Sequence, residues 1–386
     1  MSSFFPSLET FAKGTAATAA GLGTIGMGLL YYGQNFLIYP SAFPPGARED
    51  VPVPSEFSLP YQDLILTTPD NVRIKAYLLV QRPNLNIHGE TSVDWNEDVD
   101  GDGDKFAASR PTVLMFHGNG GNHGHRIPLA KIFFVKMRCN VLMLSYRGYG
   151  QSEGSPNEKG LQMDAQTALD YVLQHDKLAK GPIILYGQSI GGAVSIDLAS
   201  KNPHAITGII LENTFLSLPQ LIPSVFPILS RVTFLCHEKW ESYLKVPRIP
   251  KSIPILLLGG VRDELVPRAH MQGLWTLIRE RGRTSTPTPT STPQKKTTVS
   301  AIAAGRAAAA TEPTQPSAPA DGDVQEEEKE PVSERDGKDR YVEFGAGTHN
   351  DTCVQPGYWT TVSEFVAGLA PMKDGTSEDD EDEKVF

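Results

Sequence analysis

Short, fully apolar runs alternate with helical segments along most of this 386-residue chain. Runs such as Ile183–Gly187 and Gly208–Glu212 are rich in β-branched residues and have no polar face. This pattern is typical of buried parallel strands, with helices covering both faces of the sheet. The predicted strands are Thr112–His117, Val141–Tyr146, Ile183–Gly187, Gly208–Glu212, Pro254–Gly259 and Tyr341–Phe344. The predicted helices are Arg126–Arg138, Leu161–Gln174, Ile190–Lys201, Ala269–Arg279 and Tyr358–Gly368. The alternation predicts an α/β fold with a mostly parallel, doubly wound sheet.

Two further β-rich runs precede this alternation. Tyr61–Thr67 and Arg73–Val80 are separated by Thr68-Pro69-Asp70-Asn71, which is typical of a tight turn. The sequence therefore predicts a hairpin that adds antiparallel strands at one edge of the sheet. The main folded domain is expected to span residues 61–370.

Three segments interrupt the main domain. Residues 81–110 are polar and acidic; they resemble a calcium loop in composition but lack its final glutamate, and we expect a solvated surface insertion. Residues 213–252 are apolar, are broken by prolines and follow the carboxyl end of a strand, so they predict a small cap over the sheet. Residues 281–338 are rich in Thr, Pro, Ala and Glu, which predicts a disordered insertion. The acidic residues 371–386 are expected to form a disordered tail.

The N-terminal segment, residues 1–40, contains an uncharged run from Gly14 to Tyr39. Such a run is long enough to cross a bilayer, and its aromatic residues gather at one end. We expect a single transmembrane anchor, and hence a single-pass protein of the endoplasmic reticulum or plasma membrane. A cleaved signal peptide and a buried helix remain alternatives. Residues 41–60 are Pro-rich and predict an extended linker.

The charge and cysteine content exclude several classes of function. The net charge is −10, whereas nucleic-acid binding needs a basic surface, so we expect no nucleic-acid partner. Three widely spaced cysteines, Cys139, Cys236 and Cys353, form no CxxC pair and no closed disulfide framework. His123 and His125 lack an evident third ligand, so we expect neither a metal nor a cofactor.

The motif Gly187-Gln188-Ser189-Ile190-Gly191-Gly192 is the strongest chemical signal. It follows a predicted strand and begins a predicted helix, which is the context of a G-x-S-x-G nucleophile elbow. Such a turn needs small neighbours and presents the serine hydroxyl at a helix N-terminus, where developing negative charge is favoured. Ser189 is therefore the predicted nucleophile.

A serine nucleophile needs a base, and the base needs an acid to orient it. In chains with this elbow the order is serine, acid, histidine. Asp263 follows the predicted strand Pro254–Gly259, and His349 follows the last predicted strand. These two residues are the predicted acid and base, with Glu264 and His270 as weaker alternatives.

Two backbone N–H groups are expected to bind the oxyanion. One belongs to Ile190, directly after the nucleophile, and the other to Asn119, in the glycine-rich loop after the strand Thr112–His117. A phosphate-binding loop is the rival interpretation, but the Lys-Ser/Thr pair of such loops is missing.

Five motifs in order resemble those of the membrane-anchored α/β-hydrolases, the group of the fungal bud-emergence (Bem-forty-six-like) proteins and animal α/β-hydrolase domain-containing protein thirteen. They are His117-Gly118-Asn119-Gly120-Gly121-Asn122, the run Ser145–Gly154, the elbow itself, Asp263-Glu264-Leu265-Val266-Pro267 and Gly347-Thr348-His349-Asn350-Asp351-Thr352. The resemblance spans about Tyr61 to Leu369. It implies the α/β-hydrolase fold, one N-terminal anchor and a triad of Ser189, Asp263 and His349. It also implies work at membranes that is linked to cell polarity in fungi, and related branches remove palmitoyl groups from proteins.

The expected function is that of a serine hydrolase that cleaves carboxylic esters or thioesters. The apolar cap favours an acyl-chain substrate at a membrane bilayer, either a lipid or an S-acylated protein. One alternative is a membrane scaffold that keeps the fold but recruits partners through its insertion and tail. An acyltransferase or a peptidase using the same triad is another. A glycosylation sequon, Asn350-Asp351-Thr352, directly follows His349, and we expect it to be unused because a glycan would crowd the site.

Overall fold

A computed structural model of the chain describes residues 8–83, 102–282 and 331–369, and all structural statements refer to these ranges. The predicted acidic tail, the Asp-rich run before residue 102 and residues 283–330 of the predicted insertion lie outside them.

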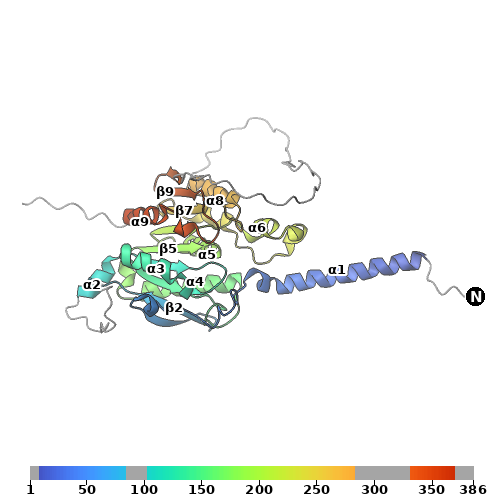
Figure 1. Cartoon of the computed structure of the whole chain (residues 1–386), viewed down its shortest axis with the longest axis horizontal. Helices are drawn as coiled ribbons and strands as arrows, with labels where there is room; N and C mark the ends of the chain where they lie inside the picture. The colour runs from blue at the N-terminus through green and yellow to red at the C-terminus, as the bar shows by residue number, and fades with distance from the viewer. Residues whose placement is uncertain (1–7, 84–101, 283–330, 370–386) are drawn as a thin grey trace, which may run out of the picture. The chain divides into compact units, whose positions relative to one another are not determined.

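The described residues form one nine-stranded sheet in the order β1-β2-β4-β3-β5-β6-β7-β9-β8 (Figure 1). Six consecutive strands of this sheet are parallel: β3 (Thr112–Phe116), β4 (Asn140–Leu144), β5 (Ile183–Gln188), β6 (Gly208–Glu212), β7 (Ile255–Gly260) and β9 (Asp339–Phe344). The predicted hairpin forms as β1 (Gln62–Thr67) and β2 (Arg73–Leu79), antiparallel at one edge. The mostly parallel sheet is thus confirmed.

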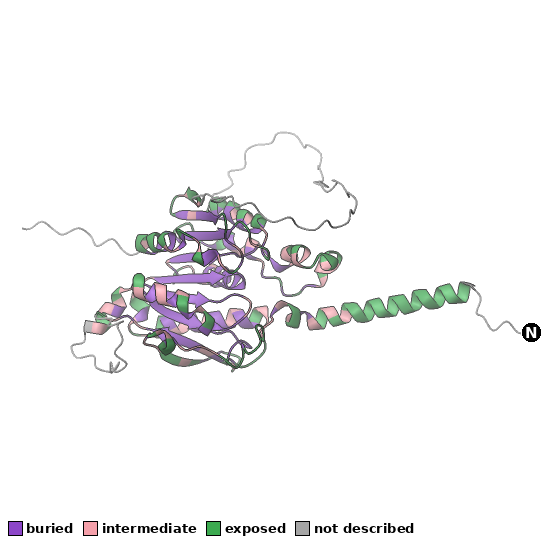
Figure 2. Cartoon of the chain, viewed as in Figure 1, coloured by how far each residue is buried: buried purple, intermediate pink, exposed green. Residues whose placement is uncertain are grey.

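Each strand sends alternate side chains to opposite faces, and both faces are buried, as Figure 2 shows by colour. In β5, Ile183 and Leu185 belong to one apolar cluster, while Ile184 and Tyr186 belong to the other. The first cluster includes side chains of α4 (Glu158–Gln174), α5 (Ile190–Lys201) and α8 (Arg268–Glu280). The second includes side chains of α3 (Ile127–Lys131) and α9 (Tyr358–Leu369). Burial on both faces explains why the strands are apolar throughout.

The strand order places a crevice at the carboxyl ends of the parallel strands. β3 lies between β4 and β5, so the connection after β3 leads to the neighbouring strand on one side, and the connection after β4 leads to the neighbouring strand on the other side. Open α/β sheets bind ligands at such a reversal point, outside the carboxyl ends of the strands. The loops after β3 and β5, which carry Asn119 and Ser189, meet there.

The cap consists of short helices: α6 (Leu218–Val225), a 3-10 segment (Pro227–Leu235), α7 (Ser242–Lys245) and a second 3-10 segment (Val246–Arg248). Ser217 accepts a hydrogen bond from the N–H of Gln220 and so begins α6, and Pro227 prevents the helix from continuing.

The predicted helix Arg126–Arg138 is interrupted. A 3-10 turn (His123–Arg126) leads into α3, which passes into a π-helical turn (Ile132–Lys136). The wider turn lets the adjacent residues Phe133 and Phe134 both lie buried in the core.

The predicted disordered insertion is shorter than 281–338. Val332–Asp336 forms β8, which pairs antiparallel with β9. Its side chains are mostly exposed, as in an edge strand, so the sequence carries no apolar signal there. At the other end Arg281 is buried and donates to Asp339, which lies beside β8.

The predicted surface insertion 81–110 is also partly folded. Gln81 is buried and donates from Nε2 to the carbonyls of Phe134 at 2.6 Å and Cys139 at 3.0 Å. Residues Asp102–Ser109 form α2. Polar composition misled the prediction here because backbone carbonyls, not apolar contacts, hold Gln81.

The predicted linker 41–60 packs on the domain. Ala47 and Leu59 are buried, and Pro54–Phe57 forms a 3-10 turn. Arg48 donates to the carbonyls of Gly148, Gly150 and Ser152. This segment is therefore a strap bound by backbone hydrogen bonds rather than an extended spacer.

The N-terminal run forms α1 (Leu8–Ile38), which is exposed over most of its length (Figures 1 and 2). No helix in the described ranges combines the length and the hydropathy needed to cross a membrane, so the predicted transmembrane anchor is not found among them. The reason is composition, because six glycines and several polar residues replace the long aliphatic side chains of a membrane span.

Candidate active site

Ser189 occupies the sharp turn between β5 and α5. Its backbone has φ 54° and ψ −118°, a conformation that costs a residue with a side chain of order 1–3 kcal/mol. A Cβ on Gly187 would lie 2.2 Å from the Gly191 carbonyl oxygen, and one on Gly191 would lie 2.0 Å from that of Phe116. The glycines of the motif are therefore required by close backbone contacts. Ser189 lies at the N-terminus of α5, as an elbow nucleophile must.

Asp263 and His349 form a hydrogen-bonded pair. The Nδ1 atom of His349 lies 2.8 Å from Oδ2 and 3.0 Å from Oδ1 of Asp263. The carboxylate also accepts the N–H groups of Leu265 at 2.9 Å and Val266 at 2.7 Å. Both side chains are almost wholly buried. A carboxylate held in this way orients the imidazole and leaves Nε2 as its proton acceptor.

The two weaker candidates have other partners. Glu264 accepts the backbone N–H of His349 at 3.2 Å, so it supports the loop and does not contact the imidazole nitrogens. His270 lies in α8 and accepts the N–H of Leu216 at 3.2 Å through Nδ1. Burial lowers the pKa of His270.

One large cavity contains both Ser189 and His349. It has a volume of about 660 Å³ and lies between the glycine-rich loop, the cap and the C-terminal end of α1. Its apolar wall includes Leu30, Leu37, Ile38, Phe215, Leu218, Leu221, Ile222, Val225 and Phe226. This volume suits a small-molecule ligand. The predicted nucleophile and base thus share a mainly apolar chamber, with Asp263 on the far side of the imidazole.

The two predicted oxyanion donors flank this cavity. Asn119 and Ile190 both line it, and neither backbone N–H has a hydrogen-bond partner among the residues that the structure describes. The next N–H groups of the loop are already used: Gly120 donates to the Gly118 carbonyl and Gly121 to the Phe43 carbonyl. Of these three successive N–H groups, that of Asn119 is left for a ligand.

The Asn119 side chain links its loop to two other segments. Its Nδ2 donates to the carbonyl of Ile38, the last residue of α1, and its Oδ1 accepts from the Tyr149 hydroxyl. These bonds set the position of the loop from both sides.

Sequence reasoning missed Asn213, which holds the loop of the predicted base. Its Nδ2 donates to the carbonyls of Thr348 and His349 at 3.1 Å each, and its Oδ1 accepts the Gly260 N–H at 2.8 Å. Asn213 directly follows β6 and has a φ of 45°, which asparagine tolerates better than most residues. An asparagine at a strand end is the available signal, but the sequence pattern assigns it only to the start of the cap.

Several polar side chains near the carboxyl ends of the parallel strands are buried. Glu212 accepts hydrogen bonds from the hydroxyls of Tyr186 and Tyr358, at 2.6 Å each, and burial raises its pKa. Burial lowers the pKa of His117 and of His123 to about 3. Both imidazoles are therefore neutral at physiological pH.

In the part of the chain that the structure describes, no three His, Cys, Asp or Glu side chains lie close enough together to bind a metal ion. Cys139, Cys236 and Cys353 are free and buried. Thr352 of the glycosylation sequon is also buried, and its hydroxyl donates to the Thr348 carbonyl.

The sequence of this chain is similar to that of several known proteins and to one family model. Residues 111–234 match the model of the alpha/beta hydrolase fold family. The chain is 37% identical to protein bem46 of Schizosaccharomyces pombe over 92% of each chain. It is 33% identical to the uncharacterized membrane protein YNL320W of Saccharomyces cerevisiae, over 89% of this chain and 93% of that one. It is 29% identical to the alpha/beta hydrolase domain-containing protein WAV2 of Arabidopsis thaliana, over 92% and 94%.

These alignments cover 92–94% of the length of each relative, so the likeness is not confined to the residues 111–234 that match the family model. Together with the elbow after β5 and the strand order, they identify the family: the chain belongs to the α/β-hydrolase superfamily, in the group that contains protein bem46 and WAV2.

Proposed function

We propose that this protein is a serine hydrolase that cleaves carboxylic esters or thioesters of acyl chains through an acyl-enzyme. The observation that carries the proposal is that His349, hydrogen-bonded to Asp263, lines the same cavity as the strained elbow serine Ser189.

In the first half of the reaction, the Ser189 hydroxyl oxygen attacks the substrate carbonyl carbon while Nε2 of His349 takes the hydroxyl proton. The carbonyl oxygen becomes an oxyanion and accepts the N–H groups of Asn119 and Ile190. When the tetrahedral adduct collapses, the bond to the leaving oxygen or sulfur breaks and His349 returns the proton to that atom. Asp263 stabilises the imidazolium throughout.

In the second half, a water molecule attacks the acyl carbon of the acyl-enzyme. His349 takes a proton from this water, the same N–H groups hold the second oxyanion, and the proton passes to Ser189 as the carboxylic acid leaves.

The cavity wall supports an acyl chain as the substrate. Aliphatic and aromatic side chains from the cap and α1 form most of it, and burying apolar surface contributes about 25 cal/mol per Å². Lipid esters and S-acylated proteins both present such a chain.

Exposed apolar side chains support work at a membrane surface. Tyr32 and Phe36 of α1 and Ile228 and Phe234 of the cap are at least three-quarters exposed. They belong to the two elements that also line the cavity. A relative that covers almost the same length is named a membrane protein. We therefore place the proposed reaction at a lipid surface.

Labelling with a fluorophosphonate probe tests the proposed nucleophile. The probe is expected to modify the folded protein at Ser189, because an activated serine attacks phosphorus as it attacks a carbonyl. Ser189→Ala should abolish labelling. Ser200→Ala, in the same helix but outside the cavity lining, is the matched control and should label normally. An intact, correctly folded protein that resists the probe would refute the hydrolase function.

A further inference from the structure

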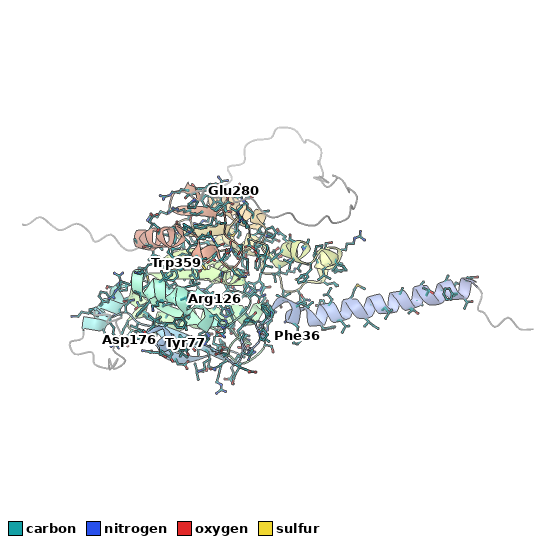
Figure 3. The ribbon with its side chains drawn as sticks, in the orientation of Figure 1. Phe36, Tyr77, Arg126, Asp176, Glu280 and Trp359 are labelled. Carbon is teal, nitrogen blue, oxygen red and sulfur yellow. The ribbon has the colours of Figure 1, made fainter. Side chains whose placement is uncertain are left out.

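Arg126 has no role in the chemistry above, yet it lines the cavity that contains Ser189. It ends the 3-10 turn His123–Arg126, just before α3, and its position can be followed in Figure 3. Its side chain also borders a second, water-sized cavity of about 10 Å³. Among the residues that line the large cavity, Arg126 is the only Asp, Glu, Lys or Arg.

The guanidinium of Arg126 has no counter-ion within the described ranges. No carboxylate oxygen lies within 4.0 Å of it, and its Nε is buried without a hydrogen-bond partner. Other buried arginines of this protein are paired, Arg147 with Asp70 and Asp164, and Arg281 with Asp339. A half-buried charge without a partner costs free energy, which a bound anion would offset.

Glu212 does not serve as that partner. Its carboxylate is occupied by the hydroxyls of Tyr186 and Tyr358, and Gln188 donates to it at 3.3 Å. Burial raises the pKa of Glu212, while the hydroxyls of Tyr186 and Tyr358 and the charge of Arg126 act in the opposite direction. The two side chains thus act on one another at a distance, but no hydrogen bond or ion pair joins them in the described structure, so the N–H groups of Arg126 are not used by Glu212.

The guanidinium lies close to the proposed oxyanion loop. An ideal Cβ on Gly118 would be 3.7 Å from the Nη2 atom of Arg126, and Gly118 directly precedes Asn119. An anionic group near this point would lie beside the reacting carbonyl rather than at the far, apolar end of the chamber.

We propose that Arg126 binds a carboxylate or phosphate group of the substrate while the acyl chain occupies the apolar part of the cavity. The planar guanidinium can donate two parallel hydrogen bonds to either anion. This inference rests on the proposed hydrolase function and narrows its substrates to acyl compounds that carry an anionic group. A phosphate would come from a lipid headgroup, and a carboxylate from an acidic acyl or leaving group.

Protection of Ser189 from the fluorophosphonate probe tests the inference without a known substrate. Three amphiphiles with one eight-carbon chain would be compared: octyl phosphate, octanoate and the neutral octanol. At least one anion is expected to halve labelling at a concentration about 10- to 100-fold below that of octanol, because hydrogen bonds to charged groups are strong. Which anion protects identifies the phosphate or the carboxylate as the source.

Two substitutions and a control complete the experiment. Arg126→Gln should abolish the stronger protection by the anion relative to octanol. Arg126→Lys should retain part of it, because lysine keeps the positive charge but cannot donate two parallel hydrogen bonds as the guanidinium does. Arg231→Gln removes an exposed arginine of the cap that does not line the cavity, and it should leave the advantage unchanged.

Equal protection by all three amphiphiles, with Ser189 still labelled, would overturn the anion site and leave the hydrolase proposal intact. The anion site is likewise overturned if Arg126→Gln and Arg126→Lys fold normally and both keep the full advantage of the anion. Failure of the unmodified protein to label would instead refute the hydrolase function on which the inference rests.

Discussion

At the scale of single residues, the carboxylate of Asp263 is held by more than its histidine. It accepts two backbone N–H groups as well as the imidazole, so its position does not depend on His349. The amide of an asparagine at this position would keep the shape but could present an N–H to Nδ1. The imidazole would then adopt the wrong tautomer.

We therefore expect Asp263→Asn to lower kcat by about 10³- to 10⁴-fold with little change in the melting temperature. Steady-state kinetics on an acyl ester and a thermal melt measure the two effects. Glu264→Gln is the comparison, because Glu264 contacts only the backbone N–H of His349. If it impairs kcat as strongly as Asp263→Asn, the acid is misassigned.

The buried histidines predict how stability depends on pH. Burial lowers the pKa of His117 and His123 to about 3, so they stay neutral in the folded protein while the unfolded chain binds protons below about pH 6.5. The unfolded state thus gains protons as pH falls, and stability decreases from about pH 6.5 toward pH 3. Each histidine contributes a slope of up to about 1.4 kcal/mol per pH unit.

We expect His123→Phe to flatten this dependence, since both ring nitrogens of His123 lack partners in the described structure and its ring packs in a tilted arrangement against Tyr77. Urea unfolding at pH 7 and pH 5 measures the difference. His204→Phe, at an exposed position, is the control. An unchanged pH slope in His123→Phe would contradict the expectation.

At the scale of elements, α1 is joined to the cap by one buried glutamine. Gln34 donates to the Leu235 carbonyl at 3.2 Å and accepts the His237 N–H at 2.9 Å. These bonds keep the C-terminal end of the helix against the cavity wall. The helix thus belongs to the site as well as to the N-terminal segment.

Gln34→Ala is expected to speed amide hydrogen exchange in residues 235–238 and to cost about 0.5–1.5 kcal/mol of stability, because partly buried backbone groups of the cap lose their partner. Exchange measured by mass spectrometry reports this directly. Gln272→Ala, on the exposed side of α8, should change neither quantity. Unaltered exchange in the cap would show that α1 is not fastened there by Gln34.

At the scale of the whole molecule, the described residues up to 282 and from 331 onward belong to one compact unit. Lys251 pairs with both Asp336 and Asp339, and Arg281 with Asp339, so ionic contacts hold the two sides of the interruption together. A loop of any length between such ends costs little extra entropy.

Replacing residues 283–330 by a flexible linker of about ten Gly and Ser residues should therefore leave the melting temperature and fluorophosphonate labelling nearly unchanged. A longer deletion that also removes β8 should lower the melting temperature, because β9 would lose its outer partner. Loss of labelling in the shorter deletion would show that the folded unit needs the removed residues.

The sheet was predictable because burial on both faces leaves an unbroken apolar signal in strands such as Gly208–Glu212. The elbow and the order of Ser189, Asp263 and His349 were predictable because their spacing follows from strand ends. The polar side chains that hold loops in place were not predictable. Gln81, Arg48 and Asn213 form hydrogen bonds with backbone carbonyls and N–H groups, and no sequence pattern indicates such bonds. The edge strand β8 was missed for a different reason, since its side chains are exposed on both faces and therefore show no apolar pattern.

The bond from Asn119 to the last carbonyl of α1 has a mechanical consequence. The backbone N–H of Asn119 is proposed to bind the oxyanion, and the side chain of the same residue is hydrogen-bonded to the end of α1. Two positions later in the same loop, the N–H of Gly121 donates to the carbonyl of the strap residue Phe43. Both ends of this three-residue span are thus hydrogen-bonded to the N-terminal part of the chain, so a tilt of α1 would displace the N–H that we propose to bind the oxyanion.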